Sequence, residues 1–85
     1  MTAMNDIQIS TTSLRDVIVA AYRETLRDDS LGHDSDFYEA GGDSMTAFQI
    51  IARVRDAFGI DVSVATVFAC PTPGDLAAAV AALGN

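Results

Sequence analysis

The sequence predicts an all-α fold, a compact bundle of three main helices and one short third helix. Apolar residues recur at spacings of three and four over several stretches, which is typical of helices that bury one face. Alanine, the strongest helix former, is abundant. The six glycines and two prolines leave room between them for long uninterrupted helices.

Length and charge limit the number of domains and the classes of partner. A chain of 85 residues accommodates one domain. Its net charge is −7, all five cations are arginines, and this balance excludes nucleic acid and anionic membranes as favourable partners. Partners with basic patches are expected instead.

Cysteine content and hydropathy point to an ordinary intracellular compartment. Cys70 is the only cysteine, so the chain makes no internal disulfide. No apolar run approaches the roughly 20 residues of a membrane span, and no basic segment followed by an apolar stretch marks a secretory signal. We therefore expect a cytoplasmic protein.

The folded domain is expected over residues 13–85, after a loose polar tail over residues 1–12, and the first helix opens this domain. Ser13 and Asp16 resemble a capping box, and the helix is predicted to run from Ser13 to near Arg27. Its inner stripe consists of Leu14, Val17, Ile18, Ala21, Tyr22 and Leu26.

A long loop over residues 31–43 is expected next, with Phe37 anchoring it to the core. The second helix begins at Asp43 or Ser44 and ends at Phe58, before a left-handed Gly59. Its inner stripe consists of Ala47, Ile50, Ile51, Val54 and Phe58.

Two further helices complete the prediction, after an extended segment over residues 60–62 that is too short for a sheet. Ser63 caps a short third helix over residues 64–69, which turns Val64, Val67 and Phe68 inward and which Pro71 ends. Thr72 caps the fourth helix, with Pro73 at its first position and Asp75 at its third. Its inner stripe is predicted to be Leu76, Ala79, Val80 and Leu83, and Gly84 ends it.

The stretch Gly41-Gly42-Asp43-Ser44-Met45 is the most informative part of the chain. Two glycines permit a tight turn and a close approach by a partner. Ser44 then stands at a helix start, where free N–H groups and the helix dipole favour a bound or attached anion. The alternative is that Ser44 is an ordinary helix cap.

Three segments resemble those of phosphopantetheine-dependent carrier proteins. They are Asp36 to Met45, which is similar to the attachment motif; Ala47 to Gly59, which is similar to the helix that follows it; and Val67 to Thr72, which is similar to a helix junction of that family. The resemblance covers roughly residues 13–83 and is strongest to peptidyl carrier domains of nonribosomal peptide synthetases.

This resemblance implies that Ser44 carries 4′-phosphopantetheine, transferred from coenzyme A by a Mg²⁺-dependent phosphopantetheinyl transferase. The arm holds an aminoacyl or acyl group as a thioester, and the carrier itself does no catalysis. Its partners are then an adenylating or acyl-loading enzyme and condensing, tailoring or thioesterase enzymes. The chain is expected to be monomeric and free-standing, although an excised synthetase domain and an acyl or aryl carrier both stay open.

Partner contacts are expected beside the arm, at Asp43, Met45, Phe48 and Val64. Met45 and Phe48 fall outside the inner stripe of their helix, and methionine adapts to varied partners. The alternative for both is that they cover the long loop or pack on the third helix.

Other functions find less support. An unmodified acidic interaction module is the second hypothesis. A serine hydrolase is third, because Thr46 stands where the Gly-x-Ser-x-Gly motif needs glycine. His33 lacks the oriented neighbour that a general base requires, and Cys70, which precedes Pro71 at a helix end, is expected to pack. The pair Asp34 and Asp36 lacks the remaining ligands of a calcium loop. We therefore predict no catalytic residue and no metal site.

Overall fold

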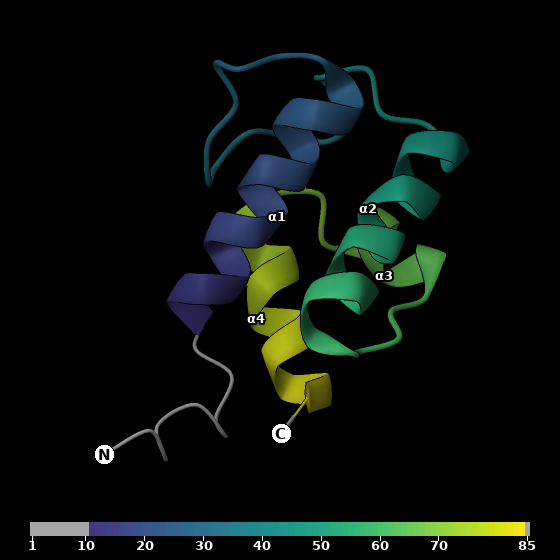
Figure 1. Cartoon of the computed structure of the whole chain (residues 1–85). Coiled ribbons are helices and arrows are strands. Elements are labelled where there is room, and N and C mark those ends of the chain that lie inside the picture. The colour runs from purple at the N-terminus through teal and green to yellow at the C-terminus, as the bar shows by residue number, and fades with distance from the viewer. Residues whose placement is uncertain (1–10, 85) are drawn as a thin grey trace.

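The computed structural model describes residues 11–84, which form four α-helices (Figure 1). These are α1 (Thr11–Leu26), α2 (Ser44–Phe58), α3 (Val64–Ala69) and α4 (Pro73–Gly84). No strand occurs among residues 11–84, which confirms the predicted all-α class. The predicted tail over residues 1–12 lies largely outside the described residues.

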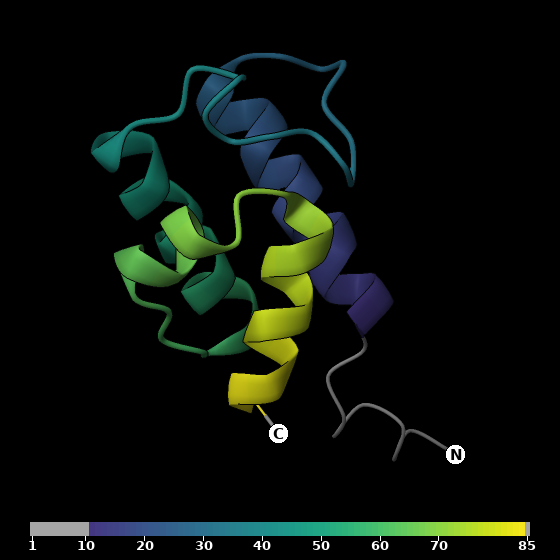
Figure 2. The same ribbon diagram turned by 180° about the vertical axis from the view of Figure 1, so that it is seen from behind.

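The helices pack around α1, which contacts both α2 and α4 and runs opposite to each of them (Figures 1 and 2). The short α3 contacts α2 and α4. The long loop between α1 and α2 crosses one end of the bundle, so the start of α2 lies at that same end. The core consists of Leu14, Ile18, Ala21, Tyr22, Leu31, Phe37, Ala47, Ile50, Val54, Ile60, Val62, Val67, Leu76, Ala77, Val80 and Ala81.

The start of α1 differs from the prediction. The helix begins at Thr11, so Ser13 and Asp16 both lie inside it and the predicted capping box at Ser13 is wrong. Apolar spacing located the buried face of α1 but did not locate its first turn, because helix starts depend on local capping rather than on periodicity.

The buried face of α4 was also predicted wrongly in part. Leu76 and Val80 are buried as expected, but Ala77 and Ala81 join them, while Leu83 is 58% exposed and Ala79 only half-buried. Nearly every residue of α4 is apolar, so its sequence carries little periodic contrast from which a face could be chosen.

Helix starts and ends elsewhere follow the predicted capping chemistry. Ser63 caps α3 by accepting a hydrogen bond from the Thr66 N–H. Thr72 accepts the Asp75 N–H at the start of α4, at 3.2 Å. Gly59 ends α2 in the left-handed conformation, with φ of 70°. These predictions are confirmed.

Phe37 anchors the long loop, as predicted. Its side chain is 0% exposed, and its ring meets those of Tyr22 and Phe68 edge to face. The Phe37 N–H donates to the Pro71 carbonyl at 2.9 Å, and the Tyr22 hydroxyl donates to the same oxygen at 2.9 Å. Burial raises the pKa of Tyr22, whose hydroxyl therefore stays protonated and keeps this bond to the junction between α3 and α4.

Candidate attachment site at the start of α2

The two glycines before α2 have different structural roles. Gly41 has φ of +89°, a left-handed conformation that side chains other than glycine adopt only with strain. Gly42 lies against the Phe37 ring, and a Cβ at this position would come within 2.5 Å of three ring carbons. The pair therefore brings the chain over the anchor residue and directly into α2.

Asp43, rather than Ser44, caps α2. The Asp43 carboxylate accepts the Thr46 N–H at 2.9 Å, and the Thr46 hydroxyl in turn accepts the Asp43 N–H at 2.9 Å. This reciprocal capping box fixes the first turn of α2. The hydrogen bond from the Thr46 N–H lowers the pKa of the Asp43 carboxyl, which therefore stays ionised at neutral pH.

Ser44 is consequently left available. It is the first residue of α2 and is exposed, and within residues 11–84 no hydrogen bond engages its hydroxyl. Ser63 offers a contrast at the start of α3, where the serine hydroxyl binds both the N–H and the side chain of Thr66. The capping role, which was the alternative for Ser44, therefore belongs to its neighbour Asp43.

The four predicted partner-binding residues differ in how far their side chains are exposed. Met45 and Phe48 are 70% and 60% exposed, so neither covers the loop or packs into the core. Val64 is half-buried and packs against the core at the start of α3. Asp43 is exposed but engaged in the capping box. The structure therefore brings Met45 and Phe48 to the surface beside Ser44, whereas Val64 offers only part of its side chain.

Tyr38 is a surface residue near this site that sequence reasoning missed. It is 53% exposed, its ring stacks on Phe68, and its hydroxyl donates to the Phe68 carbonyl at 2.8 Å. Tyr38 thereby ties the long loop to α3. Its adjacency to the buried Phe37 was the available signal, since one of two consecutive loop aromatics can point inward while the other covers the surface.

Several charged residues outside the site have structural partners. Asp36, considered above for calcium, accepts the N–H groups of Tyr38 and Glu39 and so closes a turn in the loop. Arg53 pairs with Glu24 on α1, and Arg55 lies 3.7 Å from Asp61. Among residues 11–84, no three His, Cys, Asp or Glu side chains gather as a metal site would require.

No helix in the described part of the chain is long and apolar enough to cross a membrane.

The chemistry at the start of α2 fits a covalently attached anion in most respects. The Ser44 hydroxyl is exposed and unengaged, and the positive end of the α2 dipole faces it. The Asp43 carboxylate is the one unfavourable neighbour for a phosphate, although it would also attract a Mg²⁺ ion. Fold and site together define a small helical scaffold that presents one free hydroxyl on a rigid helix start.

Comparison with known proteins places this scaffold in a family. The family described as "Phosphopantetheine attachment site" matches residues 14–80. Malpinin synthetase from Mortierella alpina is 32% identical over 82 residues, which are 96% of this chain and 1% of that protein. Phosphinothricin tripeptide synthetase PhsC from Streptomyces viridochromogenes is 45% identical over 51 residues, 60% of this chain and 5% of that protein.

Solved structures agree with the sequence relatives. BlmI, described as a type-II acyl-carrier-protein from Streptomyces verticillus involved in bleomycin biosynthesis, superposes with a TM-score of 0.80 at 30% identity, over 85% of this chain and 87% of that one. A structure described as a non-ribosomal PCP domain has a TM-score of 0.72 at 35% identity, over 84% and 91% of the two chains.

The chain therefore belongs to the phosphopantetheine attachment site family and is a carrier domain of the kind found in nonribosomal peptide synthesis. This confirms the predicted family, fold and cofactor. The family is non-catalytic in general. The chain spans 2% or less of the length of several of the synthetases that it matches.

Proposed function

We propose that Ser44 is the residue that carries 4′-phosphopantetheine, and that the chain shuttles an aminoacyl or acyl group on this arm between biosynthetic enzymes. The observation that carries the proposal is that Asp43 caps α2, which leaves the hydroxyl of Ser44 exposed at the start of this helix. Ser44 also lies within the stretch that matches the family.

Attachment requires a nucleophile from this chain and a base from elsewhere. The Ser44 oxygen attacks the phosphorus of coenzyme A that bears the pantetheine, a new oxygen–phosphorus bond forms, and adenosine bisphosphate leaves with the bridging oxygen. The serine proton needs an acceptor. Asp43 is poorly suited to that role, because its lowered pKa and its bond to the Thr46 N–H make it a weak base. The transferase supplies the base, and this chain acts as its substrate rather than as an enzyme.

The exposed apolar side chains beside Ser44 support a docking role. Met45 and Phe48 present two large side chains within about one helical turn of the proposed attachment point. Such a patch is suited to the loading, condensing and releasing enzymes that must approach the thioester in turn. Basic surfaces on those partners would match the net charge of −7. Val64 would border the patch, and cytoplasmic localisation stays a prediction.

The experiment is a transfer assay read by mass spectrometry. We expect coenzyme A, Mg²⁺ and a broad-specificity phosphopantetheinyl transferase to add one phosphopantetheine group to the wild-type chain. Ser44→Ala is expected to stay unmodified and to keep its helical circular-dichroism spectrum. Ser63→Ala, the matched serine at another helix start, is expected to be modified like the wild type. Modification of Ser44→Ala would assign the arm to another residue.

A further inference from the structure

Two helix starts in this protein use the same pair of positions. In α2 the pair is Asp43 and Thr46, and in α3 it is Ser63 and Thr66. In both pairs the first residue precedes the helix and accepts a hydrogen bond from the N–H of the threonine. Each threonine hydroxyl also meets the side chain of its capping partner, at 3.1 Å in α2 and 2.9 Å in α3. The start of α3 therefore provides an internal reference for the start of α2.

The pair in α2 makes one hydrogen bond that the pair in α3 lacks. The Asp43 N–H donates to the Thr46 hydroxyl oxygen at 2.9 Å, and the Thr46 hydroxyl lies 3.0 Å from the Asp43 carbonyl. Among the residues that the structure describes, the Ser63 N–H makes no such bond to Thr66. Both the backbone and the side chain of Asp43 are thus tied to Thr46, and the capping box encloses the two residues between them.

Ser44 lies inside this capping box and is held from the loop side as well. The Gly42 N–H donates to the Phe37 carbonyl at 2.8 Å, and Gly42 lies against the buried Phe37 ring. The Ala47 N–H donates to the Asp43 carbonyl at 2.9 Å and begins the hydrogen bonding of the helix. The backbone at Ser44 is therefore fixed on both sides, although no hydrogen bond within residues 11–84 engages the Ser44 hydroxyl.

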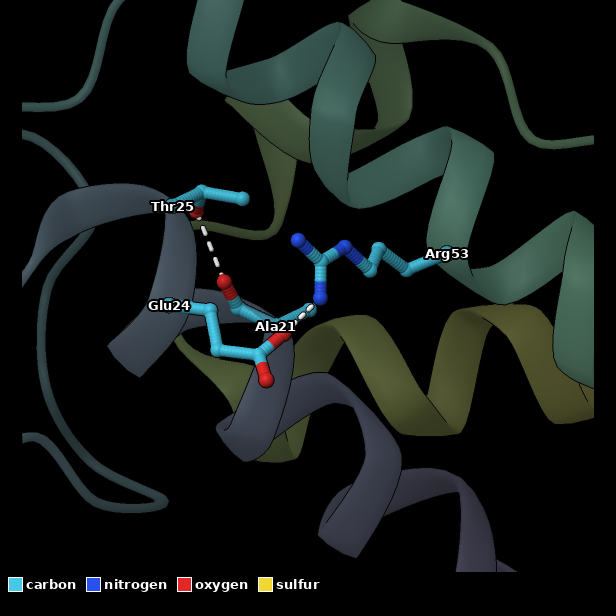
Figure 3. Close-up of polar contacts among 4 residues, drawn as sticks. All are labelled: Ala21, Glu24, Thr25 and Arg53. Carbon is cyan, nitrogen blue, oxygen red and sulfur yellow. Dashed lines mark hydrogen bonds and ion pairs between the residues drawn. The ribbon is translucent and has the colours of Figure 1, made fainter.

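A threonine elsewhere in the protein uses its hydroxyl differently. Thr25 lies near the end of α1 and donates to the Ala21 carbonyl, one turn earlier in the same helix, at 2.7 Å (Figure 3). That pattern adds a bond inside a formed helix and orders no helix start. The role of Thr46 follows from its position three residues after Asp43 rather than from its residue type alone.

We propose that Thr46 is a positioning residue for the attachment of phosphopantetheine, because its side chain closes the capping box that orients Ser44. The inference rests on the proposed function, in which Ser44 is the nucleophile. Thr46 makes no hydrogen bond to Ser44 within residues 11–84, so it acts through Asp43 and the first turn of α2. Attack requires the serine oxygen and the phosphorus to come within roughly 3–3.5 Å in a defined direction. A first turn that is already ordered lowers the cost of reaching that geometry.

The test measures the rate of attachment at several concentrations of the carrier, with coenzyme A, Mg²⁺ and a broad-specificity phosphopantetheinyl transferase. Thr46→Val keeps the branched shape of the side chain and removes the hydroxyl. We expect kcat to fall about tenfold, because the serine oxygen is less well oriented. KM should stay close to the wild-type value, because the exposed Met45 and Phe48 are unchanged. Thr46→Ser restores the hydroxyl and should return kcat to near the wild-type value.

The other two threonines provide matched controls. Thr66→Val removes the hydroxyl at the start of α3, and Thr25→Val removes the one near the end of α1. Both variants should be modified with the wild-type kcat. An equal fall in kcat in Thr66→Val would mean that Thr46 acts only through general stability, and it would overturn the proposal. An unchanged kcat in Thr46→Val, no recovery in Thr46→Ser, or a change in KM alone would overturn it as well.

Amide hydrogen exchange gives a second measurement that does not involve the transferase. The Asp43 N–H has the Thr46 hydroxyl as its acceptor, so this proton should exchange faster in Thr46→Val and at the wild-type rate in Thr46→Ser. Thr66→Val should leave its exchange unchanged. An unchanged rate in Thr46→Val would show that the hydroxyl does not order the first turn, and it would overturn the proposal. If the wild type gains no mass, or if Ser44→Ala is modified, the proposed function fails, whatever the exchange rates are.

Discussion

The long loop and the first turns of α2 are consecutive in the chain and opposite in character. The loop buries its aromatic Phe37 completely, whereas α2 exposes Phe48 over 60% of its surface. The start of the helix therefore adds two exposed apolar side chains, Met45 and Phe48, to its buried face, and the loop, although it exposes Tyr38, contributes Phe37 to the core. Sites on helices are held more precisely than sites on loops. A core-anchored loop thus serves to deliver Ser44 onto a rigid helix start.

The strongest way to break this arrangement is to remove the anchor. Phe37→Ala is expected to destabilise the fold by about 3–5 kcal/mol, because it deletes a buried ring that contacts Tyr22 and Phe68. Chemical denaturation measures this loss. Phe48→Ala is the matched control and should change stability by less than about 0.5 kcal/mol, because that ring is largely in solvent. Equal losses in the two variants would contradict the division between buried loop and exposed helix.

Overpacking at the second glycine is expected to have the next largest effect. In Gly42→Ala the new Cβ would meet the Phe37 ring at 2.5 Å, and that ring is enclosed and cannot withdraw. We expect a loss of about 1–3 kcal/mol in unfolding free energy. Phe37→Leu in the same background shortens the blocking side chain. The cost of Gly42→Ala should therefore fall in that background, and an unchanged cost would mean that the glycine is needed for another reason.

Strain at the first glycine is expected to be smaller. Gly41→Ala places a Cβ on a residue with φ of +89°, which costs about 1–2 kcal/mol, although no atom lies within 4 Å of that Cβ. Gly32→Ala is the control, since it has open space and no positive φ. Thermal melts should show Gly32→Ala unchanged or slightly stabilised. A stable Gly41→Ala would argue that the turn can relax.

The sequence predicted the fold correctly where capping residues and prolines mark the ends of helices. The bounds of α3 and its Ser63 cap were predicted correctly because a capping serine and a proline flank the helix. The anchoring role of Phe37 followed from the length of the loop. In contrast, the α4 face failed because an almost wholly apolar helix offers no contrast between its sides.

The site was predictable in part. The motif singled out Ser44, which is exposed at the start of α2, and helix periodicity placed Met45 and Phe48 outside the buried stripe. The capping role of Asp43 was not identified, although the spacing of Asp43 and Thr46 carried the signal. A groove of about 490 Å³ between α1 and α2, lined by Thr25 and Gln49 among others, could not be predicted from the sequence, because its walls come from segments that only tertiary packing brings together.

The smallest predicted effect concerns stability in acid. It compares a carboxylate at the start of α2 with a carboxylate in the loop. The pKa of Asp43 is lowered in the folded state from 3.8, so the carboxylate stabilises the fold above this value, and the contribution is lost as the pH falls through the lowered pKa. Asp43→Asn keeps an acceptor for the Thr46 N–H at every pH. Denaturation curves should therefore show a smaller acid-induced loss in Asp43→Asn than in the wild type.

The loop contains a comparable carboxylate that serves as the reference for this measurement. The pKa of Asp28 is lowered by hydrogen bonds from the Ser30 hydroxyl and N–H, so Asp43→Asn should retain part of the acid-induced loss. The variant Asp43→Asn with Asp28→Asn is expected to lose less stability in acid than either single variant. Because the two carboxylates lie in separate elements with separate partners, their effects should add. If Asp43→Asn and the wild type lose the same unfolding free energy in acid, the capping box stabilises the fold equally well with a protonated Asp43. The position of Ser44 would then not depend on the charge of Asp43.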